Sequence, residues 1–195
     1  MRIVAGRLKG RKLEVPEGRD IRPTADRTRQ ALFDVLEHGR LVEGGGSAVV
    51  DAVVLDAFCG SGALGLEALS RGAAEATFMD ANRAALDCAR ANAKHLGVPA
   101  SFVLANVTNP PRPLKPATLV FLDPPYGSGL GAQALAALAS AGWLAPGAIA
   151  SLEMPGAELA QFAVPPGFER LDERRYGKAR ILLLRATAGQ LAAVR

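Results

Sequence analysis

From residue 49 onward, short apolar runs alternate with segments in which the apolar positions recur every three or four residues. The apolar runs predict strands over residues 49–57, 76–79, 101–105, 119–122 and 148–153. The segments between them predict helices over residues 63–71, 83–95 and 131–141. Strands that alternate with helices are typical of an α/β protein with a mostly parallel sheet and helices on both faces. Two further strands, 168–171 and 180–184, predict an antiparallel hairpin at the sheet edge and bring the sheet to seven strands.

The N-terminal region shows a different pattern. Residues 1–14 alternate loosely and contain glycines, which predicts a short hairpin or an extended arm. This arm carries five basic side chains, which are Arg2, Arg7, Lys9, Arg11 and Lys12. A helix is expected over residues 25–38, with Thr24 as its N-terminal cap. The glycine-rich run 43–47 predicts a flexible linker, so we expect an arm and helix (1–42) that pack on a core domain (48–186).

The strand expected at 119–122 runs directly into Asp123, two prolines and Tyr126. Prolines lack an N–H group and cannot extend a strand, so the strand is expected to end at Asp123. Pro124 also restricts Asp123 to an extended conformation. A carboxylate, a rigid turn and an aromatic ring are therefore expected at the carboxyl end of a strand, which is where open α/β sheets bind their ligands.

A second candidate site follows the first strand of the core. Gly60, Gly62 and Gly65 have the G-x-G-x-x-G spacing of a loop that lets a ligand approach the backbone. Asp56 precedes this loop, where a carboxylate would repel a pyrophosphate and would suit a cationic group. Asp80 ends the next strand and could accept the hydroxyls of a ribose. This set fits S-adenosylmethionine, a cationic amino acid joined to a nucleoside, better than a dinucleotide. The structural alternatives are Asp80 as a helix cap and Asp56 as a loop organiser.

A bound methyl donor would give the stretch from Asp123 to Tyr126 a chemical role. The exocyclic amine of a nucleobase is a poor nucleophile, because its lone pair is conjugated into the ring. The Asp123 carboxylate and the Pro124 carbonyl can each accept one N–H bond, which would aim the lone pair at the methyl group. Tyr126 can stack on a base turned out of its helix. The structural alternative is a strand ended by prolines, with a capping Asp123 and a packed Tyr126.

Charge is unevenly distributed along the chain. Residues 1–40 hold ten Lys or Arg against six Asp or Glu, residues 41–165 hold six against ten, and residues 166–195 hold seven against three. An acidic middle between basic ends indicates either a catalytic core whose flanking segments bind a polyanion, or solvated surface charge alone.

Composition disfavours several classes of protein. No apolar run reaches the ~18 residues that a membrane helix requires. The N-terminus turns basic at once and has no secretory pattern, so we expect a cytoplasmic protein. Cys59 and Cys88 lack the spacing of metal ligands, and no metal is expected. We expect a monomer that does not bind membranes.

The combined motifs resemble the class I S-adenosylmethionine-dependent amino-methyltransferases, through Asp56, Gly60-Ser61-Gly62, Asp80 and Asp123-Pro124-Pro125-Tyr126. Within that class the chain resembles the RsmD family. This closer resemblance is carried by residues 1–6, 10–13, 22–29 with Leu32-Phe33, and 65–73. It covers most of residues 1–185 and implies a Rossmann-like fold. It also implies transfer of methyl to the exocyclic N2 amine of one guanine in 16S rRNA, within an assembled or nearly assembled 30S particle.

The resemblance implies roles for individual residues. S-adenosylmethionine would be bound by Asp56, Phe58, Gly60, Ser61, Gly62, Asp80, Ala81, Asn106 and Val107. The catalytic residues would be Asp123, Pro124, Pro125 and Tyr126. RNA would be bound by Arg7, Lys9, Arg11, Lys12, Arg22, Thr24, Arg27 and Arg29. The family often has an acid at the position of Asn106, so here an uncharged carbonyl, or backbone near Val107, would hold the adenine amine.

Other functions stay open on the sequence. The Asp-Pro-Pro-Tyr motif is shared with DNA adenine methyltransferases, so an amino-methyltransferase for adenine N6 or for guanine N2 in tRNA is an alternative. A methyltransferase for glutamine side chains and a non-catalytic RNA-binding assembly factor are two more. Residues 1–29 carry nine Lys or Arg against four Asp or Glu and have no aromatic residue, which favours phosphate contacts. Asp56 disfavours a dinucleotide oxidoreductase.

Overall fold

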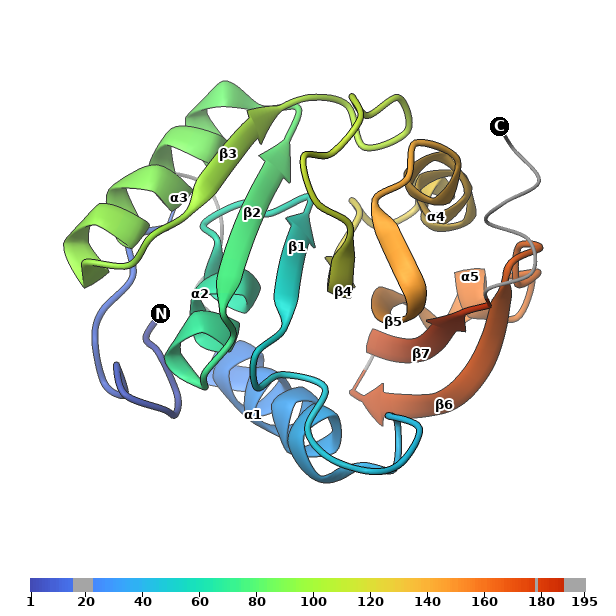
Figure 1. Ribbon diagram of the computed structural model, residues 1–195, viewed down its shortest axis with the longest axis horizontal. Helices are drawn as coiled ribbons and strands as arrows, with labels where there is room; N and C mark the ends of the chain where they lie inside the picture. Colours follow the sequence, from blue (N-terminus) through green and yellow to red (C-terminus); the bar gives the residue numbers. More distant parts are fainter. Residues whose placement is uncertain (16–22, 178, 188–195) are drawn as a thin grey trace.

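A seven-stranded sheet forms the centre of the protein, in a computed structural model that describes residues 1–15, 23–177 and 179–187 (Figure 1). The strands are β1 (Val53–Ala57), β2 (Glu75–Asp80), β3 (Ser101–Leu104), β4 (Ala117–Leu122), β5 (Leu144–Pro155), β6 (Phe168–Tyr176) and β7 (Ala179–Ala186). Their order is β3-β2-β1-β4-β5-β7-β6. The first five strands are parallel, and β7 runs antiparallel to both β5 and β6. The mostly parallel sheet and its C-terminal antiparallel hairpin are confirmed.

Successive side chains of the central strands point into two separate cores. Val54 and Phe121 pack on one face, together with α1 (Pro23–His38), α2 (Ala63–Ser70) and α3 (Arg83–Leu96). Leu55 and Leu122 pack on the opposite face, together with α4 (Leu130–Ser140) and Leu159 of α5 (Gly156–Leu159). Because both faces are covered, the strands are apolar at nearly every position, which is why they appear in the sequence as unbroken apolar runs.

Several element boundaries differ from those expected, and strand β1 begins at Val53 rather than at residue 49. The first helix begins at Pro23, a residue suited to the first helical position, so Thr24 lies inside the first turn and the prediction that it caps the helix is wrong. Strand β5 already begins at Leu144, ahead of Pro146 and Gly147, and its pairing with β4 shifts register between Ala117 and Leu119. The edge strand β6 continues to Tyr176 rather than ending at residue 171. Its charged side chains face solvent, so this part of the strand contains no apolar run.

The N-terminal arm, residues 1–15, folds back on itself and packs on the face of the sheet that α1, α2 and α3 cover. Arg2 and Lys12 form an antiparallel bridge, and the N–H of Ile3 donates to the carbonyl of Arg11 at 2.9 Å. Ile3 and Leu13 are buried in the same core as α1 and β4. The predicted hairpin-like arm is confirmed. Because the arm and α1 share the core of the sheet, the division of the chain at 43–47 stays a prediction.

A buried carboxylate, Glu67 of α2, joins the arm to the rest of the protein. Its side chain is fully buried, and its two oxygens accept the backbone N–H groups of Val4 and Ala5 at 2.8 and 2.9 Å. The same oxygens pair with the guanidinium groups of Arg29 and Arg71, which are themselves buried. One side chain therefore holds the arm, α1 and α2 together.

The arm also contacts the loop that follows β1. The side-chain amide of Asn92, on α3, donates to the carbonyls of Glu14 and of Ser61 at 3.0 and 2.9 Å. Asn92 is almost completely buried, so these bonds are shielded from water. The arm and the glycine loop are thus anchored by the same side chain.

In the part of the chain that is described, no helix has the length and apolar character needed to cross a membrane.

Candidate functional site

Three aspartates come together where β1, β2 and β4 end. In the parallel register Ala57 of β1 lies opposite Met79 of β2 and Leu122 of β4, so the residues that follow these strands share one edge of the sheet. Asp80 is the last residue of β2, and Asp123 follows β4 directly. Both are close enough to Asp56 for their charges to influence its ionisation. The edge therefore concentrates negative charge, as a site for a cationic ligand would.

Asp56 lies beneath the glycine loop rather than on its surface. Its side chain is 2% exposed, and its Oδ2 accepts the backbone N–H of Gly65 at 2.8 Å. Burial raises the pKa of Asp56 to about 8; the Gly65 bond opposes this rise, whereas the charges of Asp123 and Asp80 add to it. The role of loop organiser, left open by the sequence, is thus present, and the group is mostly protonated at neutral pH.

The glycine loop is built by close packing and an unusual backbone. A Cβ atom on Gly65 would lie 2.5 Å from Cε1 of Phe78 and 3.2 Å from Cβ of Asp56, so α2 can approach the sheet only with glycine there. Phe58 has a φ of +61°, a left-handed conformation that bulky residues rarely adopt. Such strain costs about 1–3 kcal/mol and is typical of functional sites. Gly60, Ser61 and Gly62 are buried in this turn.

Asp80 supports the same loop from the neighbouring strand. Its Oδ2 accepts the N–H of Gly60 at 3.0 Å, and its Oδ1 accepts the N–H of Asn82 at 2.8 Å. The cap of α3 is Asn82, whose side chain accepts the N–H groups of Ala84 and Ala85, so the alternative of Asp80 as a helix cap is wrong. A carboxylate has about four acceptor positions, so Asp80 keeps capacity for a hydroxyl ligand.

The remaining residues expected at the cofactor differ in exposure. Ala81 is exposed directly after β2, and Val107 is buried in the core beside α4. Asn106 is exposed, and its Oδ1 accepts both the N–H and the hydroxyl of Thr108, at 3.0 and 2.9 Å. The carbonyl of Asn106 thus organises the turn after β3.

The stretch from Asp123 to Tyr126 forms a ledge at the end of β4. Asp123 and Pro125 are exposed, whereas Pro124 is buried. Tyr126 is 57% exposed, and its hydroxyl donates to Oε1 of Glu153, on β5, at 2.6 Å. The ring therefore lies at the surface and is not packed in the core. The structural alternative of a packed Tyr126 is wrong.

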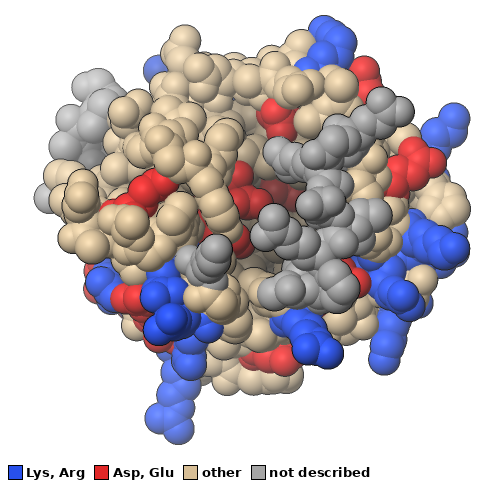
Figure 2. Space-filling view, turned by 180° about the vertical axis from the view of Figure 1, so that it is seen from behind, with Lys and Arg blue, Asp and Glu red and all other residues tan. Residues whose placement is uncertain are grey.

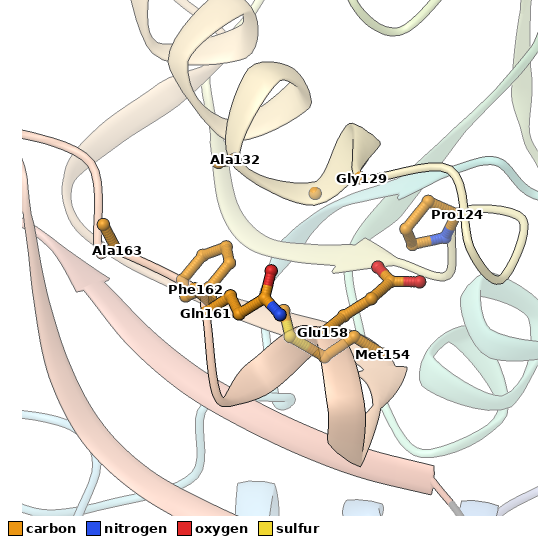
Figure 3. A pocket seen from close by; sticks show the side chains of 9 residues that line it. Pro124, Gly129, Ala132, Met154, Glu158, Gln161, Phe162 and Ala163 are labelled. Carbon is orange, nitrogen blue, oxygen red and sulfur yellow. The ribbon is translucent and has the colours of Figure 1, made fainter.

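A pocket of about 380 Å³ lies on the other side of the ledge (Figure 3). It is lined by Pro124, Gly129, Gly131, Ala132, Met154, Glu158, Gln161, Phe162 and Ala163. Glu158 also holds the ledge, because its Oε1 accepts the N–H of Gly127 at 2.5 Å. Sequence reasoning missed Glu158, Gln161 and Phe162, which belong to no motif. These residues could have been found from the predicted parallel pairing of β5 with β4, because it places the segment after β5 at the edge of the sheet where Asp123 lies.

The basic residues expected to bind RNA fall into two groups. Arg7, Lys9, Arg11, Lys12 and Arg27 are exposed. Arg29 is different: its side chain is 4% exposed and is held by Asp26, by Glu67 and by the carbonyl of Arg2. The prediction that Arg29 contacts RNA is therefore wrong, because its guanidinium is buried and bonded to groups inside the protein. Arg22 lies outside the described residues, as does the side chain of Thr24.

Figure 2 shows how charge is distributed on the face turned away from the viewer in Figure 1. Asp and Glu side chains lie at the bottom of a hollow, and most Lys and Arg side chains project at the periphery of the view. A cation is attracted to the first arrangement and a polyanion to the second.

Comparison with known proteins shows to which family the chain belongs. The family model described as Conserved hypothetical protein 95 matches residues 1–185. Ribosomal RNA small subunit methyltransferase D of Escherichia coli K12 is 40% identical over 161 residues, covering 78% of this chain and 74% of that protein. The enzyme of the same name from Haemophilus influenzae is 33% identical over 163 residues, covering 78% of each.

Solved structures agree with the sequence relatives. A structure described as a putative methyltransferase, yhhF, from Escherichia coli has a TM-score of 0.79 and 34% identity, and covers 96% of this chain and 98% of that one. The class I methyltransferase fold and the resemblance to the RsmD family, both expected from the sequence, are thereby confirmed. The chain belongs to the family described as Conserved hypothetical protein 95, whose model extends from the N-terminal arm to the last strand of the sheet.

Proposed function

We propose that this protein transfers a methyl group from S-adenosylmethionine to the exocyclic N2 amine of one guanine in the 16S rRNA of the small ribosomal subunit. The observation that carries the proposal is the arrangement of the Asp123–Tyr126 ledge beside the acidic glycine-loop site, at one edge of the sheet. The two related enzymes named above, both called ribosomal RNA small subunit methyltransferase D, support the choice of RNA.

The residues at the edge fit S-adenosylmethionine by charge and by shape. When bound, this cofactor supplies a methyl group on a positively charged sulfonium. Asp80 and Asp123 provide the negative surroundings that such a cation prefers, and Asp56 adds a further charge once it loses its proton. Gly60, Ser61 and Gly62 would admit the methionine end to the backbone, with Phe58 beside them, and Asp80 would accept the ribose hydroxyls. Ala81, Asn106 and Val107 would border the adenine.

The ledge would prepare the acceptor amine. The Asp123 carboxylate accepts one N–H of the amine and the Pro124 carbonyl accepts the other, which fixes the nitrogen with its lone pair toward the methyl carbon. Orientation of two bound reactants can supply much of the rate enhancement of a displacement. The new N–C bond would form as the S–C bond of the donor breaks, and the proton that the amine then loses would pass to water at the exposed Asp123. Tyr126 stacks on the base, and Pro125 keeps the turn rigid.

Methyl transfer to ribosomal particles tests the proposed function. Purified protein is incubated with 30S particles that lack the modification, and the product is mapped by mass spectrometry. We expect one methyl group on the N2 of a single guanine in 16S rRNA, and none on protein-free duplex DNA. A methyl group on adenine, on tRNA or on a ribosomal protein would overturn the substrate assignment. No transfer to any of these, with no binding of S-adenosylmethionine in calorimetry, would favour a non-catalytic assembly factor.

The basic arm is expected to contact the phosphates of that RNA, in a cytoplasmic protein that works as a monomer. Arg11 is exposed, but its guanidinium donates to the carbonyl of His95. Arg7, Lys9 and Lys12 are exposed as well. Replacing these three residues by alanine should weaken RNA binding and reduce the slope of log affinity against log salt by about 2, because each lost phosphate contact removes about 0.7–0.9.

Affinity for the RNA at several salt concentrations measures this slope. Lys115→Ala serves as the control, because Lys115 is an exposed lysine that pairs with Glu75, far from the arm in sequence. An unchanged slope in the triple variant would show that the arm does not contact phosphates.

Proton release should accompany cofactor binding. The raised pKa of Asp56, about 8, leaves this group mostly protonated at neutral pH, and a nearby sulfonium or ammonium favours its charged form. Binding should therefore expel a proton at neutral pH, and affinity should rise with pH until about pH 8 and then level off. Calorimetry in buffers of different ionisation enthalpy measures the released protons. Asp56→Asn, which can still accept the Gly65 bond, should bind without this release, and equal release by both proteins would refute the assignment.

A further inference from the structure

We propose that the pocket beside Pro124 receives the guanine that is methylated, and that Glu158 selects guanine over other bases. This inference rests on the proposed function and assigns it a specificity-determining residue. The Asp123 and Pro124 acceptors can hold the N–H groups of any conjugated amine, so they do not distinguish guanine from adenine. Discrimination has to come from groups that reach the ring edge next to the amine.

The pocket has the position, size and lining that a flipped base requires. Pro124, whose carbonyl faces the amine in the proposed reaction, is part of its wall, so the pocket opens directly at the ledge. Its volume of about 380 Å³ accommodates a purine with part of its sugar. Most of the lining is apolar, with Met154 and the ring of Phe162 available against the faces of a base.

Two polar side chains enter this apolar space from α5 and the turn after it. In Figure 3 the carboxylate of Glu158 lies between the amide of Gln161 and the ring of Pro124. One Glu158 oxygen accepts the N–H of Gly127, which holds the carboxylate toward the ledge. A carboxylate has about four acceptor positions, so Glu158 can accept a further N–H from a base at the same time.

The hydrogen-bonding pattern of guanine matches this pair of groups. Next to its N2 amine guanine carries N1–H, a donor, and beyond it O6, an acceptor. Glu158 can accept N1–H, and the amide of Gln161 can donate to O6. Adenine presents an unprotonated N1, whose lone pair would face the carboxylate. Base-edge matches of this kind discriminate between bases by roughly 5–150-fold.

The analogue 2-aminopurine, combined with a substitution of Glu158, isolates the contact to N1. It keeps the 2-amine that is methylated but has an unprotonated N1 and no O6. The substrate is a 30S particle reconstituted from 16S rRNA in two pieces, of which the shorter carries guanine or 2-aminopurine at the methylated position. The wild-type protein should prefer guanine. Glu158→Gln, whose carbonyl can keep the Gly127 bond while its amide donates to N1, should lower the guanine to 2-aminopurine ratio of kcat/KM by roughly ten-fold or more.

The ratio is measured within each variant, so a general loss of stability or cofactor binding cancels. Glu153→Gln is the matched control: Glu153 accepts the Tyr126 hydroxyl and does not line the pocket, so its substitution should leave the ratio unchanged. If Glu158→Gln turns over too slowly, the fluorescence of 2-aminopurine reports binding instead, and the variant should bind this site more tightly than wild type.

The outcomes separate the two proposals. An unchanged ratio and unchanged 2-aminopurine binding in Glu158→Gln, with normal activity of the wild-type protein on guanine, would overturn the role of Glu158 alone. A wild-type protein that does not methylate the guanine-containing particle would overturn the proposed function itself. A ratio that falls equally in Glu153→Gln would also overturn the assignment, because it would show a general effect of charge near the ledge.

Discussion

Replacing Asp123 by alanine is expected to lower kcat for methyl transfer by roughly 100-fold or more while the affinity for S-adenosylmethionine stays close to that of the wild-type protein. The carboxylate is exposed at the end of β4, where it can accept an N–H of the target amine, whereas the glycine loop is held by Asp56 and Asp80. Loss of Asp123 therefore removes the orientation of the acceptor and leaves the cofactor loop intact. Single-turnover transfer and calorimetric titration measure the two properties separately.

Asp123→Asn is the matched variant for this experiment. Its side chain has nearly the same shape and keeps one carbonyl acceptor without the charge, so it should retain more activity than Asp123→Ala. A parallel loss of transfer and of cofactor binding in the alanine variant would contradict the division of roles, because it would place Asp123 in the cofactor site instead.

Replacing Glu67 by alanine is expected to lower the free energy of unfolding by about 3–5 kcal/mol, because it leaves two buried cations without their shared partner. Arg29 and Arg71 pair with Glu67 in the core, and the N–H groups of Val4 and Ala5 lose their acceptor as well. Urea unfolding followed by the fluorescence of Trp143, the one tryptophan of the chain, measures this loss.

Glu75→Ala provides the comparison for that measurement. Glu75 pairs with Lys115 on the surface, where both side chains are more than half exposed, and such pairs contribute about 0–1 kcal/mol. Equal stability of the two variants would refute the view that Glu67 anchors the arm. Greater protease sensitivity of residues 1–15 in Glu67→Ala would locate the effect in the arm.

Patterns along the chain predicted most of the sheet. The central strands are buried on both faces, so their apolar runs are continuous, and the prolines after Asp123 mark the end of β4. Boundaries were wrong where polar residues form structure through long-range pairing. Strand β6 is mostly charged and is stabilised by its pairing with β7, and the four-residue helix α5 is too short to produce a period.

The candidate site was predictable only in part. Asp56, the glycines and the Asp123–Tyr126 motif were recognisable because their residue types lie at strand ends with fixed spacing, and the structure places them at one edge of the sheet. The environment of each group was not predictable. Asp56 lies under the loop, where burial raises its pKa to about 8, and no pattern in the sequence indicated that burial.

The sequence by itself determined the fold class, the positions of the glycine loop and the ledge, and the family, because periodicity, glycine and proline act locally and motifs have fixed spacing. Only the tertiary structure decided which charged residues are buried and which pockets form. Arg29 and Glu67 are 38 positions apart, and Gly127 and Glu158 are 31 apart. Contacts over such separations depend on how helices pack on the sheet and on the order of its strands. For that reason only the structure shows that Arg29 is buried among ion pairs and that Glu158 lines the pocket beside Pro124.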